Sequence, residues 1–195
     1  MKTLPMKTLL LALLLLFSPT VTEGQSQSRK PAATATNCKM TIDQAPLVRG
    51  LKLGQSFDQL QRVLPRIVKT SGEDPDEYGL RRFRFSPAVL ENPETLNGVT
   101  SVSLAYFDNS LFSIEITYSD IKWQSNLHFV AAIANQLKLP REGWQQADPS
   151  ILMCQGFFVE VADVNKLRMM DLRFPARVVQ RKAEVQAKQK SAFKP

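Results

Sequence analysis

Apolar and polar residues alternate along much of the chain between residues 80 and 174. The first three predicted strands lie around 83–85, 102–106 and 112–118. Three more are predicted at 151–154, 157–162 and 167–174. Asp108, Asn109 and Ser110 form a favourable hairpin turn between the second and third strands. Alternation of this kind is typical of an antiparallel sheet with one buried face, which here includes Phe112, Ile114, Ile116 and Tyr118, and one wet face.

Helical spacing precedes each group of strands. Ser56 and Gln59 form a capping box, and Pro65 ends the first predicted helix. The second helix begins after Ser125 and Asn126, and its inner stripe comprises Leu127, Val130, Ile133, Ala134 and Leu137. A short strand is also predicted at 38–42. The sequence therefore predicts an α+β fold: two tandem αβββ units, about 50–119 and 123–174, forming an antiparallel sheet with helices packed on one face.

The N-terminus has the pattern of a secretory signal. Two lysines are followed by an apolar run of ~10 residues and then by small residues up to Gly24. A membrane span needs about 20 apolar residues, so no transmembrane anchor is expected. We predict a signal peptide at 1–24, cleaved near Gly24, and a secreted or periplasmic mature protein. A flexible linker at 25–37, a single domain at 38–174 and a basic tail at 175–195 would follow.

Cys38 and Cys154 are the two cysteines of the chain. In an oxidising compartment an even number of cysteines favours pairing, so a structural disulfide is expected. The alternative is two separately buried thiols that act as small apolar residues.

The net charge of +7 is concentrated in the tail. Residues 175–195 hold six basic residues and one acidic residue, whereas the predicted domain is close to neutral. The tail could contact an anionic surface, but no specific nucleic-acid partner is expected.

The segment Leu51–Leu60, which reads LKLGQSFDQL, resembles a phrase found in exported bacterial proteins of the SmpA/OmlA-like envelope type. Tandem units of one helix and three strands also resemble β-lactamase-inhibitor-like proteins. There is, in addition, a general likeness to exported bacterial proteins of uncharacterised role. These resemblances imply the fold more than an activity.

Candidate catalytic chemistry is sparse in this sequence. We assign no catalytic residue, no metal ligand and no cofactor, and leave open whether the protein is an enzyme. A hydrolase acting on envelope or extracellular substrates is one alternative. It would use His128, the only histidine, or the acidic cluster of Glu73, Asp74, Asp76 and Glu77.

The wet face of the first three strands is the most promising surface. Small residues such as Ser103 make this face flat, and Arg82, Arg84 and Glu115 stand on it as charged groups. We predict a non-catalytic binding or adaptor protein whose protein or peptide partner contacts Arg82, Arg84, Ser103 and Glu115. A structural protein tethered to an anionic surface by its tail is a further alternative.

Overall fold

The structure is a computed structural model, which describes residues 38–65, 74–87, 96–119 and 123–192. The predicted signal peptide, the predicted linker and Glu73 lie outside the described residues.

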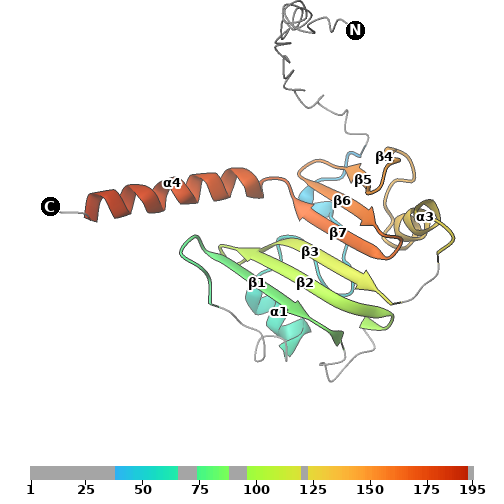
Figure 1. Cartoon of the computed structure of the whole chain (residues 1–195), viewed down its shortest axis with the longest axis horizontal. Coiled ribbons are helices and arrows are strands. Elements are labelled where there is room, and N and C mark those ends of the chain that lie inside the picture. The colour runs from blue at the N-terminus through green and yellow to red at the C-terminus, as the bar shows by residue number, and fades with distance from the viewer. Residues whose placement is uncertain (1–37, 66–73, 88–95, 120–122, 193–195) are drawn as a thin grey trace, which may run out of the picture. The chain divides into compact units, whose positions relative to one another are not determined.

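One seven-stranded antiparallel sheet organises the domain. Its strands lie in the order β1-β2-β3-β7-β6-β5-β4 (Figure 1). Their bounds are β1 Leu80–Phe85, β2 Val99–Phe107, β3 Ser110–Tyr118, β4 Trp144–Gln145, β5 Ser150–Met153, β6 Phe157–Ala162 and β7 Lys166–Asp171. All six predicted strands between residues 80 and 174 are present, and the α+β class is confirmed. Asp108 and Asn109, both with positive φ, form the predicted β2–β3 turn.

Helices α1 (Phe57–Val63) and α3 (Asn126–Gln136) cover the same face of this sheet. The ring of Phe57 stacks on Phe83 at a centroid distance of 5.4 Å. On the interior strand β3, Tyr118 contacts Phe129 of α3 edge to face at 5.7 Å. The strand register places Phe83 and Tyr118 on one side. Packing of these two helices on a single face, as predicted, is therefore confirmed.

The side that α3 turns toward the sheet differs from the prediction at two residues. Leu127 was expected inside but is 55% exposed, whereas Phe129 is 2% exposed. The Phe129 ring contacts both Tyr118 and Trp123, and these aromatic contacts fix the rotation of the helix.

Each half of the domain consists of a helix followed by an antiparallel meander. Strands β1–β3 follow α1, and β4–β7 follow α3. The last strands of the two meanders, β3 and β7, pair at the centre of the sheet. The second half adds the two-residue strand β4, which was not predicted.

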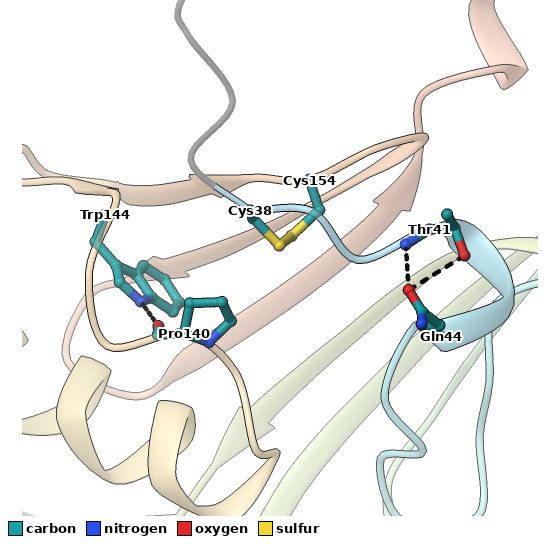
Figure 2. The surroundings of a disulfide bond; sticks show 6 residues. All are labelled: Cys38, Thr41, Gln44, Pro140, Trp144 and Cys154. Carbon is teal, nitrogen blue, oxygen red and sulfur yellow. Dashed lines mark hydrogen bonds between the residues drawn. A yellow bond between two sulfur atoms is a disulfide. The ribbon is translucent and has the colours of Figure 1, made fainter.

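The strand predicted at 38–42 is wrong. Cys38 is joined by a disulfide to Cys154, 116 residues further along the chain, with their Cα atoms 4.5 Å apart (Figure 2). The predicted pairing of the cysteines is confirmed. The bridge holds this segment beside the end of β5, where the Gln155 amide donates to the Met40 carbonyl at 2.9 Å. The chain then turns into the 3₁₀ helix Ile42–Gln44, because the Gln44 carboxamide accepts a hydrogen bond from the Thr41 amide.

Phe112 also lies on a different side from the prediction. Strict alternation would place it beside Ile114 on the buried face, but the β2–β3 register shifts between Ala105 and Tyr106. Leu111 consequently pairs with Tyr106, and Phe112 is the extra residue of a β-bulge. Its ring stacks on Phe174, on the face that α1 and α3 leave uncovered.

The C-terminal segment forms helix α4, Phe174–Ala192, rather than an extension of the last strand. Asp171, whose side chain is 3% exposed, accepts hydrogen bonds from the Arg173 backbone and guanidinium and so ends β7. These bonds raise the pKa of Arg173. Phe174 then packs on Phe107 and Phe112, which are buried but separate from the main core. No helix in the described ranges is long and apolar enough to cross a membrane.

Candidate functional site

The face of the sheet opposite α1 and α3, here called the open face, carries the residues predicted to bind a partner. Arg84 lies opposite Ser103, Ser103 opposite Glu115, and Glu115 opposite Arg168. Arg168 in turn lies opposite Glu160. We call these five residues the charged row. It crosses five neighbouring strands, and the sign of its charges alternates.

A second row lies beside the charged row. Arg82, Ala105 and Ser113 are aligned across β1, β2 and β3, and the apolar side chains of Met170, Phe158 and Met153 continue the row across the other half. These three apolar side chains are half-buried. The open face therefore combines charge with accessible apolar surface, a mixture common in binding surfaces.

The two rows meet in a hollow of about 570 Å³ beneath the start of α4. The stacked rings of Phe112 and Phe174, with centroids 3.5 Å apart, form one of its walls. All four residues predicted from the sequence, namely Arg82, Arg84, Ser103 and Glu115, line this hollow together with Arg168 and Met170. The structure thus brings the predicted residues together.

The charges of this face form few contacts with one another. Among the described residues, no ion pair or hydrogen bond involves the side chains of Arg82, Arg84, Glu115 or Glu160, and the charge of Glu115 acts only at longer range on Lys166. The Arg168 guanidinium lies 5.9 Å from the centre of the Phe158 ring, a weak cation–π distance. Neighbouring opposite charges that remain unpaired are free to bind groups of another molecule.

Sequence reasoning missed Arg168, Met170 and Phe174. Arg168 and Met170 belong to the predicted strand at 167–174, and alternation places both on the side of that strand opposite Leu167 and Met169. Their alignment depends on the pairing of β3 with β7, which alternation within a single strand does not reveal. Phe174 enters the site because α4 begins there.

A second hollow of about 620 Å³ lies beside α1. Leu47 and Val63, which are 63% and 41% exposed, line it. Two of its polar side chains hold the local structure together: Lys52 Nζ donates to the Asp43 carbonyl at 2.8 Å, and Gln59 Oε1 accepts from the Ser56 amide at 2.8 Å. These contacts make the second hollow part of the helix cap and favour the open face as the binding site.

The described residues of the hydrolase alternative line neither hollow. His128 is exposed, and its Nδ1 lies 3.0 Å from Ser125 Oγ, the group that caps α3. Asp76 Oδ1 accepts from the amides of Tyr78 and Leu80 and so orders its own turn. In the ranges that the structure describes, no three His, Cys, Asp or Glu side chains gather as a metal site would require.

Comparisons with known proteins give little further information. No family model and no curated protein matches the chain. Among solved structures, a cysteine-rich secretory protein from Staphylococcus aureus has a TM-score of 0.39 and 11% identity. The similarity covers 64% of this chain and 46% of that protein. The chain thus spans less than half of its length, and the likeness carries no argument about function.

Proposed function

We propose that this protein is a non-catalytic, exported binding or adaptor protein that recognises a protein or peptide partner through its open face. The observation that carries this proposal is one hollow in which charged side chains without an ion pair among the described residues lie beside apolar ones. Arg84, Glu115 and Arg168 of the charged row line this hollow with Met170 and Phe174. Unpaired charges can select a partner by complementarity, and the exposed apolar side chains can supply buried area.

Export rests on the N-terminal pattern and is supported by the disulfide. A bridge between Cys38 and Cys154 is expected in an extracellular or periplasmic compartment. We propose cleavage of a signal peptide near Gly24. Intact-mass measurement of protein recovered from the medium or the periplasm would test this. A mass that includes residues 1–24 would contradict it.

Cross-linking capture from an envelope or medium extract tests the binding role. Arg82→Ala with Arg84→Ala, and separately Glu115→Ala with Arg168→Ala, should each reduce recovery of the same partner by about tenfold, the effect of losing one or two desolvated polar contacts. The matched control is Lys52→Ala with Arg62→Ala, which changes two cations of the other hollow. Equal recovery by all variants would overturn the assignment of the site.

A second candidate is attachment to an anionic surface through α4. Lys188 and Lys190 are exposed on this helix, and no ion pair among the described residues uses them. Binding to vesicles with and without anionic lipid, at low and high salt, tests this role. Binding that does not change when residues 175–195 are deleted would exclude it.

A further inference from the structure

Strand β1 forms one edge of the sheet, and no described strand lies beyond it (Figure 1). The opposite edge is β4, which has two residues, whereas β1 has six. Short edge strands offer little backbone to another chain. Of the two edges, β1 is therefore the one that could accept an added strand.

The ladder between β1 and β2 shows which backbone groups of β1 point outward. The Gly79 carbonyl accepts from the Asp108 amide at 3.2 Å, so this backbone carbonyl points toward β2. The backbone amide and carbonyl of Leu80 point away from β2, because both bond to Asp76, at 2.8 Å each. In an antiparallel ladder this direction alternates with a period of two residues.

The outward-pointing residues after Leu80 are consequently Arg82 and Arg84. Asp76 satisfies the groups of Leu80, but no described residue bonds to the outward amides and carbonyls of these two arginines. Two complete donor–acceptor pairs are left at the edge. They belong to the same residues whose side chains border the hollow of the open face.

Charge decides which kind of strand the edge would accept. Arg82 and Arg84 are exposed, and the third arginine of the strand, Arg81, places its guanidinium 4.3 Å from the centre of the Phe57 ring. Two β1 edges from separate copies would set arginines against arginines, which disfavours self-pairing. A strand with acidic residues would instead set carboxylates opposite these arginines, which favours pairing.

We propose that an extended acidic peptide segment of the partner adds to the sheet as an antiparallel strand beside β1. This inference rests on the proposed function and specifies the chemistry of its partner. In such a strand, acidic residues lie opposite Arg82 and Arg84 on the open face. The residue between them lies opposite Phe83 on the other face and is apolar. The recognised sequence thus alternates acidic and apolar residues.

The test uses a synthetic peptide that alternates glutamate and valine and carries a fluorescent label. In fluorescence anisotropy it should bind the wild-type protein at least about tenfold more tightly than a peptide of the same composition in which the glutamates are contiguous. The Arg82→Ala/Arg84→Ala protein should bind it about tenfold more weakly. Circular dichroism verifies that this variant is folded.

Backbone methylation of the peptide separates strand addition from simple charge attraction. In an antiparallel pair, residues opposite Arg82 and Arg84 donate their own amides to β1, so N-methylation of the glutamates should abolish binding. N-methylation of the valines, which leaves charge and methyl count equal, should leave binding intact. Equal affinity of the two methylated peptides would overturn the inference.

Separate outcomes distinguish this inference from the proposed function. The control pair Lys52→Ala with Arg62→Ala should leave peptide affinity unchanged, because these two cations line the other hollow and lie off β1. If the alternating peptide binds no better than its contiguous counterpart while partner capture still depends on Glu115 and Arg168, the strand addition is wrong and the binding role of the open face stands.

Discussion

Arg181 Nη2 lies 2.7 Å from Asp108 Oδ2 and so joins helix α4 to the turn between β2 and β3. The same guanidinium lies 5.7 Å from the centre of the Phe107 ring. Arg177 lies over that ring as well, at 4.9 Å. The first turns of α4 are therefore fastened to the hairpin by both charge and aromatic contact.

Arg181→Ala should loosen α4 without unfolding the domain. Both members of the pair are about one-third exposed, so the change should cost only ~0.5 kcal/mol of global stability. Amide hydrogen exchange within residues 177–185 should become faster, and high salt should have the same effect on the wild type. The control is Lys188→Ala, which removes a cation of the same helix that forms no ion pair with any described residue. Equal exchange in the two variants would contradict this anchoring role.

Removing the ring of Phe174 should release α4 more completely. The ring stacks on Phe112, which is 5% exposed, and its loss uncovers that side chain. We expect Phe174→Ala to lower the free energy of unfolding by about 2 kcal/mol. Val179→Ala, at a residue 69% exposed in the same helix, should change it by less than about 0.5 kcal/mol. Urea titration measures both, and similar values for the two variants would argue against the stacking contact.

The disulfide should supply much of the stability of the domain. Closing a loop of 116 residues corresponds to about 4–5 kcal/mol of unfolded-state entropy. The Cys38→Ser/Cys154→Ser variant should lose roughly that amount in urea unfolding, and reductant should lower the wild type to the same level. Reductant should leave the double variant unchanged, which is the internal control. A wild type insensitive to complete reduction would disprove this role.

Tyr106 and Tyr118 should respond oppositely to removal of their hydroxyls. Tyr106 is 1% exposed and its hydroxyl has no hydrogen-bond partner among the residues that the structure describes, so Tyr106→Phe should be neutral or stabilise by up to about 1 kcal/mol. The Tyr118 hydroxyl bonds to Arg49, so Tyr118→Phe should cost about 1 kcal/mol. Thermal unfolding of the pair measures the difference. A loss for Tyr106→Phe as large as that for Tyr118→Phe would show that its hydroxyl is engaged.

Stability should fall in alkaline solution. Burial raises the pKa of both Tyr106 and Tyr118 above the usual value of 10.0. The folded state therefore favours the neutral phenol, and its full stabilisation is present below the unfolded-state pKa. It is lost as the pH rises from about 10 toward the raised folded-state values. Urea unfolding between about pH 8 and pH 11 should show this decline, and Tyr106→Phe should flatten it.

Much of this architecture follows from local pattern. Ser56 and Gln59 cap α1 as their spacing predicts, and the alternation around Ile114 and Ile116 matches β3. The errors arise where a distant residue decides the local conformation. The disulfide to Cys154 fixes Cys38 in a segment that is not a strand. The one-residue bulge places Phe112 on the other side of the sheet.

Part of the candidate site was likewise predictable from local pattern, and part was not. Arg82, Arg84, Ser103 and Glu115 share a face because each strand has a period of two. Arg168 joins them only through the pairing of β3 with β7, a contact between segments far apart in the chain. Such pairing depends on the whole sheet, so no local pattern could have supplied it.

The pairing of β3 with β7 also determines the order in which the strands can associate during synthesis. While the chain is being made, β1, β2 and β3 can associate as soon as Tyr118 is present, but β7 is complete only at Asp171. Until then one edge of the nine-residue strand β3 has unpaired backbone amides and carbonyls, with apolar side chains beside them. A chain interrupted before Lys166 would keep that edge permanently, so we expect it to aggregate rather than to yield a stable half-domain.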